Sequence, residues 1–295
     1  MADTPPPLPL DTSFDPQTGQ LVAVAPGIGR VTAPNGGPFT FTGTNSFVIG
    51  DGRVALLDPG PDDPRHLAAL RQAIARRPVE AIILTHTHSD PSASAARLKA
   101  ELGAPLWFGG PHRLSRPLRP FERNPIGRDC DWALVPDRTL VDGEQVDVGG
   151  IRLTTITTPG HCANHLCFGI DGSDLLLSGD HVMGWNSTLV AVPDGSMADY
   201  LASLRKLIGL GARRYVPAHG GPIADGAGRP QLHILVRVAG LGRATLLLRR
   251  DGAGCEAPRP DQEPGVGDHA VVRTHGESLD MPPADHRLAR FGIGE

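Results

Sequence analysis

Four short segments rich in histidine and aspartate, each directly after an apolar run, constrain this chain more than any other feature. The first, Thr85-His-Thr-His-Ser-Asp90, follows Ala81-Ile-Ile-Leu. Two histidines two positions apart at a strand end can project to the same side, and an aspartate two residues on can turn into the same cavity. A zinc-class ion prefers this mix of imidazole and carboxylate. The segment therefore predicts a metal site at a strand end, where open α/β sheets place their ligand sites.

Three more segments repeat this arrangement further along the chain. Thr158-Pro-Gly-His161 follows Leu153-Thr-Thr-Ile, Ser178-Gly-Asp180-His181 follows Leu175-Leu-Leu, and Pro217-Ala-His219 follows Tyr215-Val. Small residues beside each candidate ligand let the backbone and a metal approach closely. A single histidine of this kind is better explained as a structural residue. The ordered set of candidate ligands favours one shared metal centre.

In this order, His86-Thr-His88-Ser-Asp90, Pro159-Gly-His161, Gly179-Asp180-His181 and Ala218-His219-Gly220 resemble the motifs of the metallo-β-lactamase superfamily. The flanking Thr42-Gly-Thr-Asn45, Asp58-Pro-Gly60 and His219-Gly-Gly-Pro-Ile223 resemble its β-lactamase-like protein 2 branch, close to the glyoxalase II-like hydrolases. The likeness covers about residues 20–225. It implies an α/β fold, a four-layer αβ/βα sandwich with the metals at one edge, here with a C-terminal extension.

The resemblance also implies a role for each candidate ligand. A first metal would be bound by three histidines, a bridging aspartate would contact both metals, and an aspartate and a histidine would hold the second. In that order these residues are His86, His88 and His161; Asp180; and Asp90 and His219. Asp90 would also act in catalysis, by orienting the attacking water and taking up its proton.

Pro91 departs from the pattern, because the superfamily places another histidine directly after the aspartate. Proline cannot bind a metal, but it suits the first position of a helix, where its missing N–H costs nothing. Asp90, Asp180 and His219 still give three protein ligands, the number found in many catalytic zinc sites. We therefore expect one or two zinc ions per chain, the second bound more weakly.

These residues predict a metal-dependent hydrolase that uses a zinc-activated hydroxide on an ester, a thioester or a phosphodiester. The substrate is left open between a small ester-like molecule and RNA, as in a hydroxyacylglutathione hydrolase-like or a ribonuclease-like enzyme, because one fold hosts all of these reactions. The alternative is a non-catalytic or impaired metal-binding member of the same fold. Pro91 favours that alternative, and the six retained ligands favour the enzyme.

Other polar residues near the motifs are expected to play supporting roles. His165 and His181 could line the pocket, but hydrogen bonding to the ligands is favoured. Asp58 is expected in a turn or in a supporting contact. Solvent exposure is expected for five further histidines: His112, His233, His269, His275 and His286. A loop holds five arginines that could form a lip for an anionic substrate, although a solvated loop is favoured: Arg113, Arg116, Arg119, Arg123 and Arg128.

Composition divides the chain of 295 residues into three parts. Residues 1–20 are rich in proline and predict a flexible N-terminal arm. Residues 21–228 would form the catalytic domain. Residues 229–295 mix glycine, proline and charged residues without a clear period, which predicts a partly disordered accessory segment in place of the compact helical domain that commonly ends the family.

Charge, hydropathy and cysteine usage point to the cytoplasm. The formal net charge of -4 argues against bulk electrostatic binding of nucleic acid, although it leaves room for a local basic patch. The N-terminus has no secretory signal, and no stretch reaches the roughly 18 apolar residues that a membrane span needs. The four scattered cysteines are expected to be reduced, partly buried thiols.

Short apolar runs between turn residues predict the individual elements. Helices are expected at Pro64–Arg76, Pro91–Leu102 and Met197–Gly209. Strands are expected at Phe39–Thr42, Asn45–Ile49, Arg53–Asp58, Val79–Thr85, Leu106–Phe108, Arg152–Thr157, Leu166–Ile170, Leu175–Ser178 and Arg214–Pro217.

Overall fold

The computed structural model of this chain describes residues 10–186, 188–210 and 214–224, and the backbone of strands 231–238, 242–249 and 273–274. Most of the predicted accessory segment, residues 229–295, and the first nine residues of the predicted arm lie outside the described residues. Within the arm, the ring of Phe14 lies under the guanidinium of Arg30, 4.5 Å from the ring centroid. The division of the chain into these three parts remains a prediction.

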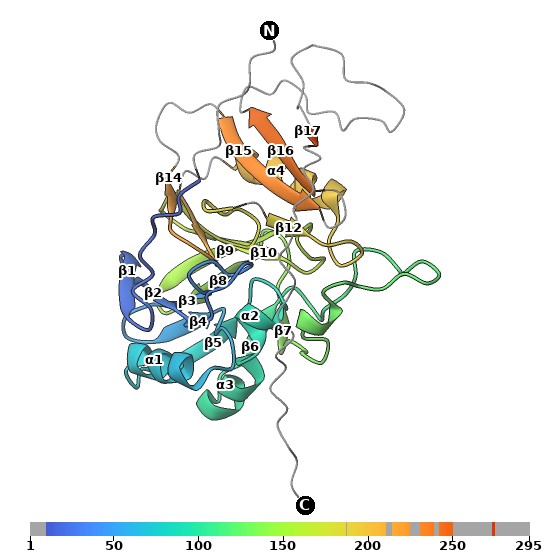
Figure 1. Cartoon of the computed structure of the whole chain (residues 1–295). Coiled ribbons are helices and arrows are strands. Elements are labelled where there is room, and N and C mark those ends of the chain that lie inside the picture. Colours follow the sequence, from blue (N-terminus) through green and yellow to red (C-terminus); the bar gives the residue numbers. More distant parts are fainter. Residues whose placement is uncertain are drawn as a thin grey trace, which may run out of the picture.

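Two sheets form the centre of the molecule (Figure 1). The first sheet has seven strands in sequence order: β1 (Leu21–Ala25), β2 (Ile28–Thr32), β3 (Asn45–Ile49), β4 (Val54–Leu57), β5 (Val79–Ile83), β6 (Leu106–Phe108) and β7 (Arg138–Thr139). The second has six in the order β14 (Ile223–Ala224), β13 (Arg214–Pro217), β11 (Leu175–Gly179), β10 (Leu166–Ile170), β9 (Ile151–Thr157) and β8 (Gln145–Val148). A third sheet joins β12 (Thr188–Val190), β15 (Gln231–Val238), β16 (Gly242–Arg249) and β17 (Arg273–Thr274).

Helices cover the outer faces of the two central sheets. In Figure 1, α1 (Pro64–Ile74) and α3 (Ala95–Leu102) lie at the bottom, below the first sheet, and α4 (Met197–Gly209) lies at the top, beyond the second. Phe47, Leu57 and Ile83 of the first sheet pack against Leu153 and Phe168 of the second. Separate apolar clusters lie under α1 and α3 and under α4. The order helix, sheet, sheet, helix confirms the predicted four-layer sandwich.

Capping residues explain where the two longest helices begin. Before α1, the carboxylate of Asp63 accepts from the backbone N–H groups of Arg65 and His66, and Pro64 takes the first helical position. Before α4, the hydroxyl of Ser196 accepts from the N–H of Asp199. Helix α4 has the predicted bounds. None of the helices in the described part of the chain is long and apolar enough to cross a membrane.

The structure corrects two predicted elements. Phe39–Thr42 is a turn, not a strand, because its alternating aromatic residues lie in a loop in which Phe41 has a φ of 54°. The helix predicted at Pro91–Leu102 is two helices, α2 (Ser89–Ser92) and α3. Pro91 is therefore the third residue of α2 and not its first, but it still precedes the first intrahelical donor, which is the N–H of Ser92.

The cysteines within the described residues agree with prediction. Cys130, Cys162 and Cys167 are buried free thiols. Burial raises the pKa of the Cys167 thiol to about 12. These groups are therefore inert protonated thiols. Cys255 lies outside the described residues.

Candidate metal centre

The four ligand-bearing segments meet at one edge of the sandwich. They follow β5 of the first sheet and β9, β11 and β13 of the second. Thr44 pairs with His219 through the backbone, and the side-chain amide of Asn45 donates to the carbonyls of Pro217 and Gly220, at 3.0 Å each. The Thr42-Gly-Thr-Asn45 motif thus ties the two sheets together beside the site.

Three histidines form the first group of candidate ligands. His86, His88 and His161 each offer a ring nitrogen, and these nitrogens lie within 4.8 Å of one another. Nε2 of His161 is 2.8 Å from Nδ1 of His88. Nε2 of His86 is buried and has no hydrogen-bond partner among the residues that the structure describes. A buried polar atom without a partner is costly, so this arrangement fits residues that bind a metal ion.

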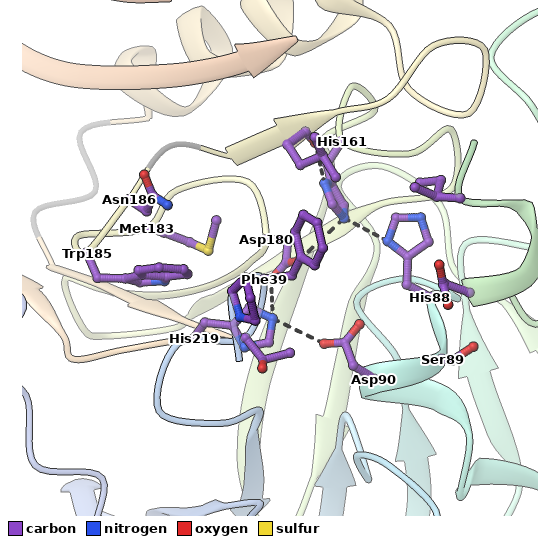
Figure 2. Close-up of a pocket in the computed structure, with 15 residues that line it drawn as sticks. Phe39, His88, Ser89, Asp90, His161, Asp180, Met183, Trp185, Asn186 and His219 are labelled. Carbon is purple, nitrogen blue, oxygen red and sulfur yellow. Dashed lines mark hydrogen bonds and ion pairs between the residues drawn. The ribbon is translucent and has the colours of Figure 1, made fainter. Parts of the chain in front are cut away.

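The other three predicted ligands continue from this group. Figure 2 shows an unbroken chain of contacts from His88 through His161, Asp180 and His219 to Asp90. Asp180 lies 3.5 Å from Nε2 of His161 and 3.3 Å from Nε2 of His219. Nε2 of His219 is also 3.1 Å from the carboxylate of Asp90. Asp180 thus stands between the two groups, and all six predicted ligands lie together.

Electrostatics differ between His86 of the first group and His219 of the second. Burial, together with the charge of His88, lowers the pKa of His86 well below its usual value, so that the ring is neutral. At His219 burial acts to lower the pKa, but the carboxylates of Asp180 and Asp90 raise it well above its usual value. Neutral imidazole is the form that binds metal, so His86 is ready to do so. At His219 a metal ion would have to displace a proton.

Backbone carbonyls orient two of the histidines. Nδ1 of His161 is 2.7 Å from the carbonyl oxygen of Leu189, and Nδ1 of His219 is 3.2 Å from that of Gly43. Because a carbonyl only accepts, Nδ1 carries a proton in both rings. In their neutral forms, both rings therefore turn the lone pair of Nε2 toward the site.

Side chains orient the other two ligand histidines, His86 and His88. Nδ1 of His86 is 2.9 Å from the hydroxyl of Thr85, which in turn donates to the buried carboxylate of Asp58 at 2.8 Å. Asp58 also accepts from the N–H of Thr85, and burial raises the pKa of its carboxyl group to about 8. Asp58 therefore contacts Thr85 and not the ligand group, in keeping with the supporting contact expected for it.

Asp194 supports His88, and sequence reasoning missed it. One oxygen of its buried carboxylate is 2.9 Å from Nε2 of His88, and the other is 2.8 Å from Nε2 of His112. His112, predicted to face solvent, is buried and also lies 2.9 Å from the hydroxyl of Thr87. No local pattern distinguishes Asp194, because its partners are 106 and 82 residues away in sequence.

His165 and His181 lie beside the candidate ligands. Nε2 of His165 accepts from the N–H of Asp180 at 3.1 Å, which is the supporting role favoured for it. His181 is buried, its ring nitrogens have no hydrogen-bond partner within the described part of the chain, and burial lowers its pKa to about 3. The side chains of the other histidines predicted to be exposed, His233, His269, His275 and His286, lie outside the described residues.

Gly160 explains the Pro159-Gly-His161 motif. Its φ is 145°, and a Cβ atom there would come within 2.3 Å of the Cα atom of Tyr200 in α4. Only glycine lets the segment bearing His161 approach the helix this closely.

A cavity of about 260 Å³ opens onto the ligands. Ser89, Asp90 and His161 are among its lining residues (Figure 2). None of the five loop arginines lines it, and Arg116 pairs with Glu122 at 2.6 Å. The position of these arginines is that of a solvated loop and not of a lip for an anionic substrate.

Comparison with known proteins identifies the family. Residues 39–219 match the sequence model of the family described as "Metallo-beta-lactamase superfamily". The chain belongs to the metallo-β-lactamase superfamily. Its fold is also similar to that of a metallo-β-lactamase family protein from Thermus thermophilus, with a TM-score of 0.58 and 27% identity over 69% of this chain and 76% of that one.

Two curated relatives have different names. A β-lactamase-like protein 2 homolog of Caenorhabditis elegans is 31% identical over 66% of this chain and 62% of its own length. An atrochrysone carboxyl ACP thioesterase of Aspergillus terreus is 28% identical over 78% of this chain and 64% of its own length. The chain thus spans less than two thirds of the length of these relatives.

Proposed function

We propose that the protein is a metal-dependent hydrolase that cleaves thioesters. One observation carries the proposal: three histidines converge on a buried point, with the unpartnered Nε2 of His86 among them, and a cavity opens beside them. Membership of the superfamily and the thioesterase names of relatives support hydrolysis. Thioesters are preferred to phosphodiesters because no arginine or lysine lines the cavity, among the residues that the structure describes.

His86, His88 and His161 would hold the first metal ion, and Asp90, Asp180 and His219 a second. The mixed nitrogen and oxygen ligands favour zinc. A bound zinc-class ion lowers the pKa of water to near neutrality and polarises the acyl carbonyl.

Asp90 would handle the proton of the attacking water. Its side chain is 27% exposed and lines the cavity, and it is 3.2 Å from the hydroxyl of Thr44, which donates to it. The water oxygen forms a bond to the acyl carbon, and the carbon–sulfur bond breaks. The proton that Asp90 accepts passes to the departing thiolate, so that a carboxylic acid and a thiol are released.

The second candidate function is metal binding without turnover. Pro91 favours it, because this buried residue of α2 offers no ligand atom where the superfamily pattern has a histidine.

Metal analysis combined with turnover separates the two functions. Zinc-loaded protein should hydrolyse a simple thioester faster than a matched oxygen ester or a phosphodiester. His86→Ala should lose the zinc ion and the activity together, whereas Asp90→Asn should keep the first zinc ion and lose about 10²–10⁴-fold in kcat. Zinc-loaded protein that turns over none of the three substrates is a non-catalytic member of the fold.

A further inference from the structure

The cavity beside the metal centre has two chemically different sides. One consists of the candidate ligands His88, Asp90, His161, Asp180 and His219. The other consists of large apolar side chains, among them Phe39, Met183, Trp185 and Leu189. In Figure 2, Met183 and Trp185 lie across the cavity from His88 and Asp90. We call these four apolar residues the apolar wall.

Packing from behind fixes this wall in place. Trp185 stacks on Phe41, with ring centroids 4.7 Å apart and an angle of 9° between the planes. Gly220 has a φ of 80°, and a Cβ atom there would come within 2.9 Å of Cδ1 of Trp185. The indole therefore packs directly on the turn that follows the ligand His219, which links this part of the wall to the metal centre.

The charge around the cavity disfavours an anionic substrate. Three carboxylates, from Asp90, Asp129 and Asp180, line the cavity, and no lysine or arginine of the described residues does so. The nearby loop arginine Arg113 donates to the backbone carbonyls of Gly109 and Ala163 instead. Asp90 and Asp180 pair with His219, but a phosphate or carboxylate lying beyond the metal ligands would meet Asp129, with no lysine or arginine of the described residues to balance it.

The volume limits the size of the bound group. Small-molecule sites usually have about 300–1,000 Å³, so a cavity of about 260 Å³ lies just below this range. It accommodates one small group and not a folded polymer. Apolar atoms buried against such a wall favour binding in proportion to the area removed from water.

We propose that the apolar wall binds the acyl group of the thioester and that this group is neutral and apolar. The proposal rests on the thioesterase function proposed above and specifies the substrate for it. The acyl carbonyl lies at the metal ligands, the hydrocarbon part lies against Met183, Trp185 and Leu189, and the thiol points outward. Phe39, which is 65% exposed, covers the hydrocarbon part from the rim.

A series of acyl thioesters of N-acetylcysteamine tests the proposal. From acetyl through butanoyl to hexanoyl, kcat/KM should rise about fourfold per added methylene until the cavity is full. Succinyl, which matches butanoyl in length but carries a negative charge, should be at least tenfold worse than butanoyl. Phe39→Ala should flatten the dependence on chain length, because it removes the ring that covers the hydrocarbon part.

Phe121→Ala is the matched control, because Phe121 is a fully exposed phenylalanine on the loop between Arg116 and Arg128 and does not line the cavity. It should leave the whole series unchanged. Equal rates along the series, or succinyl as good as butanoyl, would overturn the assignment of the wall while leaving a thioesterase. An equal effect of both alanine substitutions would overturn it as well.

Binding without turnover distinguishes this proposal from the proposed function. The thioether analogue S-hexyl-N-acetylcysteamine cannot be hydrolysed, and calorimetry should show that zinc-loaded protein binds it at least tenfold more tightly than the S-ethyl analogue. Phe39→Ala should lose most of that difference. If the analogues bind in this order and no thioester is hydrolysed, the apolar wall does bind a hydrocarbon group, but the proposed thioesterase function is wrong. Equal binding of both analogues overturns the wall.

Discussion

The proton position on each histidine ring decides what the metal centre can bind. His161 and His219 donate through Nδ1 to backbone carbonyls, which leaves Nε2 for a metal ion. The two ring nitrogens of His88 have the opposite roles: Nδ1 faces His161 in the site, and Nε2 contacts the carboxylate of Asp194. The carboxylate of Asp194 thereby sets both the tautomer and the orientation of one ligand. Partners of this kind are an integral part of metal sites.

Replacing Asp194 with asparagine should weaken zinc binding by about 10–100-fold, because asparagine has no negative charge and offers only one acceptor oxygen to the ring nitrogens of His88 and His112. The affinity is measured by competition with a coloured chelator. Asp137→Asn is the control, since the carboxylate of Asp137 likewise accepts two hydrogen bonds, from Lys99 and from the backbone N–H of Leu106, but lies away from the site. Unchanged zinc affinity in Asp194→Asn, or an equal loss in both variants, would contradict this role.

Pro91→His should raise the affinity for a second metal ion. Its position next to Asp90 is where the superfamily pattern has an imidazole. The backbone N–H that histidine would bring to position 91 needs no partner within α2, because Ser92 is the first intrahelical donor. The loss of the fixed φ should cost about 0.4–1 kcal/mol of stability. Zinc stoichiometry and thioester turnover are compared in the two proteins. An unchanged stoichiometry would show that residue 91 does not face the metals, or that the second site is already full.

At the scale of elements, periodicity and capping residues made much of the fold predictable. Leu166–Ile170 and Met197–Gly209 have the predicted bounds, because a buried run and a capped helix are defined by neighbouring residues. The strand predicted at Phe39–Thr42 was wrong, because alternating apolar and polar residues alone cannot distinguish a strand from a loop whose side chains line a cavity. The predicted solvent exposure of His112 was wrong for a related reason. Its partner Asp194 is distant in sequence, and only the fold brings the two together.

Helix α1 should make the stability of the protein sensitive to acid. His66 in α1 is buried, its ring lies 2.9 Å from the hydroxyl of Ser46 on β3, and burial lowers its pKa from 6.5 to about 4. Between these values the unfolded chain binds a proton that the folded protein refuses, so stability is full above pH 6.5 and is lost as the pH falls toward 4. The loss attributable to His66 is roughly 2–3 kcal/mol.

Urea unfolding of metal-free protein at about pH 7.5 and about pH 4.5 measures the loss in the free energy of unfolding, because most of the titration of His66 falls between these two pH values. Between these two pH values, the free energy of unfolding of His66→Gln should decrease by roughly 2–3 kcal/mol less than that of the unsubstituted protein. The buried His165 and His181, whose pKa values are also lowered by burial, remain in both proteins and contribute equally. Identical decreases in the two proteins would show that His66 does not titrate in this range.

At the scale of the whole molecule, the metal centre joins the two sheets. His86, His88 and Asp90 follow β5 of the first sheet, whereas His161 follows β9 of the second. The apolar layer between the sheets holds them face to face. Across the ligand edge, the backbone pairing of Thr44 with His219 and the amide of Asn45 provide direct links. A bound metal ion would add a link through Nε2 of His86, which has no hydrogen-bond partner among the described residues.

Metal removal should therefore destabilise the whole sandwich and not only the site. At a free zinc concentration about 100 times the dissociation constant, binding to the folded state adds about 2.7 kcal/mol to the free energy of unfolding. Denaturant unfolding with zinc and with a chelator measures this increment, and both sheets should unfold in one transition. His86→Ala should lose the increment, whereas Phe121→Ala, on the exposed loop, should keep it. If zinc stabilises His86→Ala as much as the unsubstituted protein, zinc binds elsewhere, and the ligand set derived from the four segments is wrong.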